Sequence, residues 1–191
     1  MKGLNPIEKG EYGYIDNRKK RLLVLSILSL TIVLIIFLTG LIIYHTNKSI
    51  YAVIAAVASL PAAKLLTLYL VIIKYKTGSL DIYEFISKKA EESSAKYVCD
   101  IVIASESKNS YIQFAYVVDG KIYLYTDYAK IDISFAEKYI KKILDDNCNY
   151  SSVKIYTDKE KYLSAVKKSS SLEEPSHMDE RICNRLLAYS M

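Results

Sequence analysis

The sequence predicts a membrane α-helical hairpin followed by a small cytoplasmic α/β (α+β) domain, and three observations lead to this fold class. Two long apolar runs, 22–44 and 50–73, lie near the N-terminus. Lys and Arg gather outside these runs and are nearly absent between them. From residue 79 onward, apolar residues recur with helical or strand spacing, in the order helix, three strands, helix, strand and helix.

Each apolar run is long enough to cross a membrane. The run 22–44 holds 23 residues and no charge, and the run 50–73 holds 24 residues and one charge, Lys64. At 1.5 Å per residue the runs extend roughly 34 to 36 Å, against a hydrocarbon core of about 30 Å. A secretory signal has a shorter apolar stretch that ends in a small-residue cleavage site, and no Ala-x-Ala pattern follows the first run. We therefore expect two uncleaved spans.

The distribution of Lys and Arg predicts the orientation. Six of them precede the first run, only Lys48 lies between the runs, and Lys74 and Lys76 follow the second run. Because basic loops stay in the cytoplasm, both termini are expected on the cytoplasmic side of the plasma membrane. Residues 1–21 then form a cytoplasmic tail, mobile or interfacial, because they show no periodic apolar face.

The net charge of +5 belongs to the segments that flank the membrane. From Thr77 onward the sequence has 16 Lys plus Arg against 18 Asp plus Glu. Basic residues beside the spans indicate membrane lipids as partners, since anionic headgroups attract them. A nucleic-acid partner is not expected, because it would require a basic patch on the domain itself.

The predicted domain covers 79–168, followed by a linker and a C-terminal helix over 169–191. This helix is expected to fold back on the domain through Ile182, Leu186 and Leu187. Its strongest local signal is Asp119-Gly120, the dipeptide typical of a two-residue hairpin in which both central residues take positive φ. The predicted helices are 80–96, 132–146 and 158–167, and the predicted strands are 97–103, 111–118, 121–127 and 153–156.

Cysteine and histidine usage predicts neither a metal site nor a cofactor. Cys99, Cys148 and Cys183 follow no CxxC or Cys/His spacing, and the chain has only two histidines. In a cytoplasmic domain the three thiols are expected to be reduced.

The order helix, three strands, helix, strand is similar to the core of restriction-endonuclease-like domains. That resemblance implies a divalent metal held by an acidic residue and an acidic-x-Lys pair. The nearest match here is Asp100 with Glu106-Ser-Lys108. In that family the pair lies on the third strand, whereas Glu106 and Lys108 follow the first predicted strand, so a divergent nuclease is the less favoured reading.

The second span contains two residues that an apolar helix does not need. Pro61 removes a helical hydrogen bond, and Lys64 costs at least about 2.5 kcal/mol near a bilayer centre. Such a charge predicts a functional site by default. The alternative is that Lys64 extends to the interface while alanines of this span pack against another helix.

The Leu-Pro-Ala-Ala stretch that begins at Leu60, together with the Lys-Tyr-Lys exit at Lys74, resembles a set of small bacterial two-span proteins. Some of these carry an O-linked GlcNAc transferase-like label. That activity is not carried over, because the chain has no Asp-x-Asp motif and no nucleotide-sugar domain of adequate length.

Two functional hypotheses follow. The first is a non-enzymatic membrane-anchored module whose cytoplasmic domain binds a ligand or protein, with a protein partner or homo-oligomer formed through the second span. The rival is a membrane-tethered enzyme, either a nuclease that uses Asp100, Glu106 and Lys108 or a protein related to glycosyl transfer.

Overall fold

The computed structural model describes residues 7–45, 50–105, 108–145, 150, 152–169 and 177–190. These residues divide into two compact units. One contains residues 15–76, and the other combines residues 7–14 with everything from Thr77 onward. Two long apolar helices followed by a small mixed α/β domain confirm the predicted fold class at that level.

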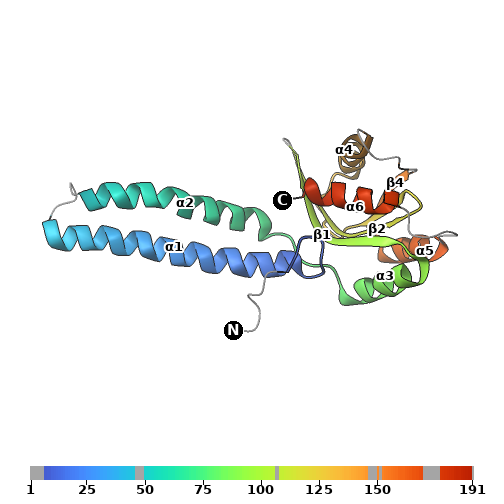
Figure 1. Ribbon diagram of the computed structural model, residues 1–191, viewed down its shortest axis with the longest axis horizontal. Helices are drawn as coiled ribbons and strands as arrows, with labels where there is room; N and C mark the ends of the chain where they lie inside the picture. Colours follow the sequence, from blue (N-terminus) through green and yellow to red (C-terminus); the bar gives the residue numbers. More distant parts are fainter. Residues whose placement is uncertain are drawn as a thin grey trace. The chain divides into compact units, whose positions relative to one another are not determined.

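The first unit is a pair of helices, α1 (Tyr14–Tyr44) and α2 (Ile50–Ile72), which run side by side (Figure 1). Both are long and apolar enough to cross a membrane. Helix α1 starts before the predicted span, at Tyr14, and so takes in part of the predicted tail. No Gly or Pro interrupts residues 14–39, and Asp16 forms an ion pair of 2.7 Å with Lys19 one turn later, which supports the extension.

The second unit is built on a four-stranded sheet in the order β1-β2-β3-β4. Its first three strands are antiparallel neighbours, and β4 is parallel to β3. In the β2–β3 hairpin, Asp119 and Gly120 have φ values of 49° and 69°, as the predicted turn requires. The strands are β1 (Lys96–Ala104), β2 (Asn109–Val118), β3 (Lys121–Tyr125) and β4 (Ser152–Tyr156).

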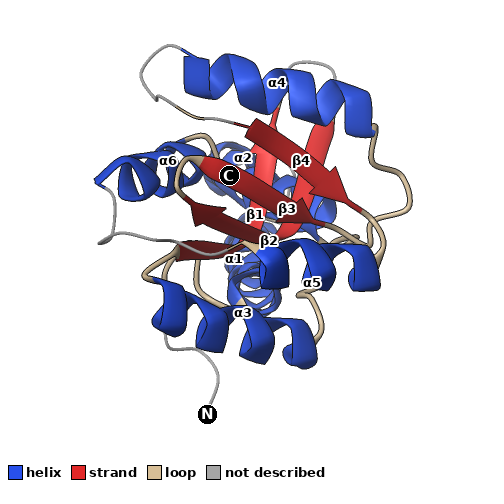
Figure 2. Ribbon diagram, turned by 90° about the vertical axis from the view of Figure 1, so that its right-hand side faces the viewer, coloured by secondary structure: helices blue, strands red, loops and turns tan. Residues whose placement is uncertain are grey.

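Helices cover both faces of the sheet, which gives three layers (Figure 2). On one face α4 (Ile133–Asp145) and α6 (His177–Ala188) bury an aliphatic core with the strands. On the other face α3 (Leu80–Ser93) and α5 (Lys159–Lys168) cover a core rich in tyrosine. Two buried faces explain why β1 and β2 are apolar along most of their length.

The alternation of side chains slips by one residue in the middle of β1. Val98 and Ile101 belong to the aliphatic core, although their odd separation should place them on opposite faces. Between them Asp100 has a φ of 54°, a left-handed conformation that non-glycine residues rarely adopt. The partner strand slips at the same level, since Ile112 and Ala115 also share the aliphatic core.

Residues ahead of α1 are part of the domain, in contrast to the tail predicted over 1–21. The carbonyl of Gly10 accepts a hydrogen bond of 2.8 Å from the N–H of Cys99 on the edge strand β1. The Tyr12 ring stacks on Tyr83 at 4.4 Å, and its hydroxyl donates to the carbonyl of Gly78 at 2.9 Å. The prediction missed this packing because so short a segment has no periodicity.

The C-terminal helix is also part of the domain core. Ile182 and Leu186 of α6 are completely buried against the sheet. The Asp179 carboxylate, itself buried, accepts hydrogen bonds from the backbone N–H groups of Asp119 and Gly120 at 3.1 and 2.9 Å. The domain thus extends well beyond the predicted 79–168, because α6 fastens the turn between β2 and β3.

Candidate functional site

The two hairpin helices pack along a seam of mostly small side chains. Between residues 22 and 44 the less exposed positions of α1 are separated alternately by four and three residues, which is the spacing of a packed helix pair. Ala55 and Ala62 of α2, 4% and 0% exposed, face the same seam. Small residues let helix backbones approach closely inside a membrane. The α1 positions are Leu22, Ser26, Ser29, Val33, Ile36 and Gly40.

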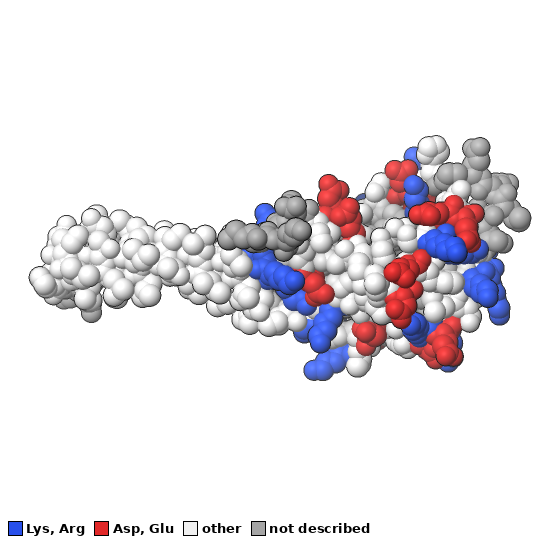
Figure 3. All heavy atoms as spheres, turned by 90° about the horizontal axis from the view of Figure 1, so that it is seen from below, with Lys and Arg blue, Asp and Glu red and all other residues white. Residues whose placement is uncertain are grey.

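Away from the seam the hairpin surface is apolar and exposed. Leu60 and Ile42 are 69% and 68% exposed, and most other large apolar residues of both helices are exposed as well, generally to a smaller degree. The face seen in Figure 3 carries no charged side chain along the apolar part of α1. Contiguous apolar surface of this extent is rare on soluble monomers and is typical of surfaces that contact lipid or another protein.

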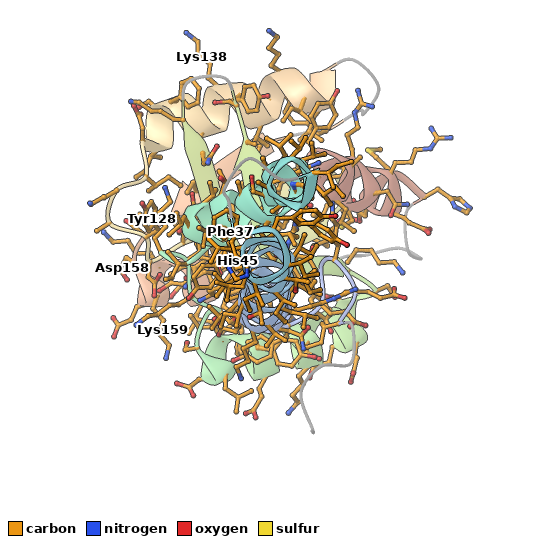
Figure 4. All side chains as sticks on the ribbon, turned by 90° about the vertical axis from the view of Figure 1, so that its left-hand side faces the viewer. Phe37, His45, Tyr128, Lys138, Asp158 and Lys159 are labelled. Atoms are coloured by element: carbon orange, nitrogen blue, oxygen red, sulfur yellow. The ribbon has the colours of Figure 1, made fainter. Side chains whose placement is uncertain are left out.

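A shallow apolar groove of about 430 Å³ lies between α1 and α2. Val33 and Phe37, the latter labelled in Figure 4, line its α1 side. Ala52, Ala56 and Ser59 line its α2 side, and the Ser59 hydroxyl donates to the Ala56 carbonyl within the helix. The hydroxyl of Ser59 is therefore bonded within its own helix, and the other lining side chains are apolar. The groove suits acyl chains or an apolar side chain, and these lining residues offer no catalytic group.

Lys64 lies outside both the groove and the seam. It follows Ala62 by two residues, a rotation of about 200° around an α-helix, so it projects from the side of α2 opposite the seam. Its side chain is exposed, and among the described residues it forms no ion pair. The structure therefore places the single charge of the two apolar runs on a surface that α1 does not cover.

Pro61 lies inside α2 and is exposed as well. Because proline has no N–H, the carbonyl of Val57 loses its usual helical donor. Lys64 is seven residues from Val57, two turns along the same face of the helix. Pro61 and Lys64, the two intramembrane candidates, therefore lie on the outward half of α2.

Asp100, the first nuclease candidate, is buried at the slip in β1. Its two carboxylate oxygens accept hydrogen bonds of 2.8 Å, one from the Tyr111 hydroxyl and one from the Thr77 hydroxyl. Thr77 is the residue at which the domain resumes after α2, so this carboxylate fastens the start of that part of the domain to the sheet. The hydrogen bonds stabilise an otherwise unfavourable backbone conformation.

Lys108 is not brought to Asp100. Its ammonium group pairs with Asp132 at 2.8 Å, and this hydrogen bond lowers the pKa of the Asp132 carboxyl. By the register of β1 and β2, Asp100 is level with Gln113, five positions from Lys108, or about 16 Å at 3.3 Å per residue. Glu106 lies outside the described residues, and β3, the third strand of the sheet, carries no carboxylate.

Two of the three cysteines are described, and both are buried and reduced. Burial raises the pKa of the Cys183 thiol to about 12 and raises that of Cys99 further. Thiols of this kind stay protonated and are poor nucleophiles at neutral pH. Cys148 lies outside the described residues. No group of three metal-ligating side chains occurs in the part of the chain that the structure describes.

Sequence reasoning missed Gly10, Tyr12 and Asp179, which join distant segments to the sheet. The only available signal was weak. Gly10 and Gly13 lie in a short polar stretch and both have positive φ, which indicates a defined turn rather than a tail. Comparisons with protein-family models, with curated proteins and with solved structures gave no match to this chain.

Proposed function

We propose that this chain is a membrane-anchored, non-enzymatic module whose α/β domain binds a protein partner on the cytoplasmic face of the plasma membrane. The observation that carries the proposal is that residues 7–14, before α1, and the chain from Thr77, after α2, fold into one compact unit. If both helices cross the bilayer, segments that fold together must emerge on the same side.

The side is assigned from charge. Lys and Arg outside the spans greatly outnumber Lys48 between them, which favours a cytoplasmic domain. Because the chain leaves the domain before α1 and returns to it after α2, the helical anchor is joined to the domain by two chain segments. Such an arrangement suits a protein that keeps a partner at the membrane.

Binding is favoured over catalysis by the way the domain uses its reactive side chains. The carboxylates of Asp100 and Asp179 are buried and bonded to parts of the fold. Asp158 caps α5 through the N–H groups of Glu160 and Lys161 at 2.9 and 3.2 Å. These groups support the fold and are not directed toward a shared cleft.

The rival is the membrane-tethered enzyme. Its nuclease form rests on the likeness of α3, the three-strand meander, α4 and β4 to restriction-endonuclease-like cores, and its glycosyl-transfer form rests on resemblance alone. The separation of Lys108 from Asp100 and the Lys108–Asp132 pair disfavour the nuclease. Mg²⁺-dependent cleavage of plasmid DNA by the purified full chain, lost in Asp100→Asn, would establish the rival.

Topology is tested by labelling single cysteines in intact cells after the native cysteines are replaced. A cysteine at Asn47 should react with an impermeant maleimide, whereas one at Ser170 should react only after the cells are opened. Reaction at Ser170 in intact cells would overturn the cytoplasmic placement.

Binding is tested with a photo-crosslinking amino acid at exposed domain positions, one for each of three helices: Lys88 on α3, Lys138 on α4 and Lys161 on α5. Lys138 projects from α4 away from the sheet (Figure 4). We expect a discrete crosslinked product from at least one position, with a mass that separates a second copy from a different protein. No product at any of the three would count against a binding domain.

A further inference from the structure

We infer that the outward face of α2 pairs with a membrane-spanning helix of a different protein, one that carries an Asp or Glu at the depth of Lys64. This inference rests on the proposed function, in that α1 and α2 must cross the membrane. It adds the chemistry of the partner and the residue that recognises it.

The first step is the isolation of the charge within its own chain. Lys64 is the only charged residue in 22–44 and in 50–72. It projects opposite the seam that Ala55 and Ala62 form with α1. Charged side chains inside membranes generally pair with one another or with backbone carbonyls, so an unpaired lysine on this surface requires a partner.

The second step excludes a second copy as the source of the counter-charge. The apolar runs of another copy contain no carboxylate, and a second Lys64 would repel the first. The Val57 carbonyl, which lacks a helical donor because of Pro61, lies on the same face and is able to accept a hydrogen bond, but as a dipole it does not neutralise a cation. A carboxylate must therefore come from another chain.

The third step concerns lipid phosphate, the other anion in a membrane. Lys64 lies 14 residues after Ile50 and eight before Ile72, about 21 and 12 Å from the two ends of α2. Helical side chains lean toward the helix N-terminus, which for α2 is the end remote from Lys74. The ammonium thus leans away from the nearer interface, and the farther one is well beyond the reach of four methylenes.

The neighbours of Lys64 fit a helix rather than a small anion. Val53, Val57 and Leu60 share its face, and Leu60 and Val57 are 69% and 63% exposed. A helix laid along this face would cover these apolar side chains while its carboxylate meets Lys64. Inside a membrane such a charge pair also fixes the register of the two helices.

The test uses the purified full chain in phosphatidylcholine nanodiscs with synthetic Leu/Ala-rich transmembrane peptides. The peptides differ only at a central residue, which is Asp, Asn or Leu, and association is measured by energy transfer between dyes. We expect the Asp peptide to associate at least tenfold more tightly than the Leu peptide. Lys64→Leu should abolish this preference and Lys64→Arg should retain it.

Leu60→Ala is the matched control, since it alters the same face one turn away and keeps the charge. It should leave the preference for the Asp peptide in place. Equal binding of the three peptides to the wild type, or an unchanged preference in Lys64→Leu, would overturn the inference. A Lys64-dependent effect seen only when phosphatidylglycerol is added, and not with the Asp peptide, would assign Lys64 to lipid and also overturn it.

Two further measurements distinguish failure of the proposed membrane anchor from failure of the inference about its partner. Carbonate-resistant insertion and cysteine labelling at Asn47 are measured on the same wild type and variants. If the chain does not insert, the membrane anchor itself fails. If it inserts normally and shows no preference that depends on Lys64, only the inference about its partner fails.

Discussion

The carbonyl of Gly10 accepts a 2.8 Å hydrogen bond from the N–H of Cys99. This bond ties a residue that precedes α1 in the sequence to the edge strand β1, which follows α2. Edge strands present unpaired backbone groups that natural proteins cover. On β1 the cover comes from both ends of the chain, because Ile103 also bridges to Ser190. Residues near the two ends of the sequence therefore protect one strand.

Gly10→Ala should destabilise the domain more than Gly13→Ala does. Both glycines have positive φ, which costs alanine roughly 1 to 2 kcal/mol. A Cβ at Gly10 would also lie 2.7 Å from Val98 and 2.9 Å from Leu187, whereas at Gly13 the nearest atom is 3.8 Å away. Overpacking costs about 1 to 3 kcal/mol more. Urea unfolding in detergent, followed by tyrosine near-ultraviolet circular dichroism, measures the difference, and equal losses would contradict the packing.

Two substitutions of Tyr12 should separate the contribution of its hydrogen bond from that of its ring stacking. Tyr12→Phe keeps the ring and removes the hydroxyl that donates to the Gly78 carbonyl, which should cost about 0.5 to 1.5 kcal/mol. Tyr12→Ala also removes the stacked contact with Tyr83 and should cost more, up to the roughly 3 to 5 kcal/mol of a fully buried aromatic side chain, because Tyr12 is half-buried. If Tyr12→Ala unfolds at the wild-type urea concentration, residues 7–14 do not contribute to the domain.

The sequence predicted features that are encoded locally. The Asp119-Gly120 hairpin follows from the backbone conformations those two residues tolerate, and the apolar helices follow from length and composition. The spacing Ser134-x-x-Glu137 is that of a capping box, in which Glu137 would cap its own helix. Instead Asp132 bonds the Phe135 N–H there, and Glu137 accepts the Ile155 N–H from the edge strand β4. A competing long-range partner decided that contact.

The candidate site was predicted only in part, for the same reason. A lysine inside an apolar run is visible in the sequence, but the side of α2 that it occupies depends on which residues pack against α1. The role of Asp100 depends on Thr77 and Tyr111, which lie 23 and 11 residues away. No local pattern predicts a slip in both strands of a hairpin at one level.

Asp100→Asn should be tolerated far better than Asp100→Ala. Asparagine keeps an acceptor oxygen and adopts the left-handed conformation of this position readily. Alanine removes the carboxylate that accepts from the Thr77 and Tyr111 hydroxyls. Each hydrogen bond to a charged group contributes about 1.5 to 3 kcal/mol. Urea unfolding of both variants provides the measurement. A loss for Asn as large as for Ala would mean that the charge, not the hydrogen-bond geometry, stabilises the strand.

Asp179→Ala should loosen the contact between α6 and the β2–β3 turn. The substitution removes the acceptor of the Asp119 and Gly120 N–H groups, with an expected loss of about 3 to 6 kcal/mol for two charge-assisted bonds. Glu180→Ala is the control, because its side chain is exposed in the same helical turn. Amide hydrogen exchange at Gly120 should accelerate in Asp179→Ala only. Equal protection in both variants would show that the Asp179 carboxylate does not hold the β2–β3 turn.

Alkaline pH should destabilise the folded domain through Cys183. Burial raises the pKa of its thiol from 9.0 to about 12, so the folded state keeps a proton that the unfolded state releases above pH 9. This stabilisation is complete below pH 9 and is lost as pH rises toward 12. Between pH 9.5 and 10.5 the free energy of unfolding should fall by about 1 kcal/mol more in the wild type than in Cys183→Ala. Parallel slopes in the two proteins, or alkylation of Cys183 at pH 8 without urea, would show that the thiol is accessible in the folded domain.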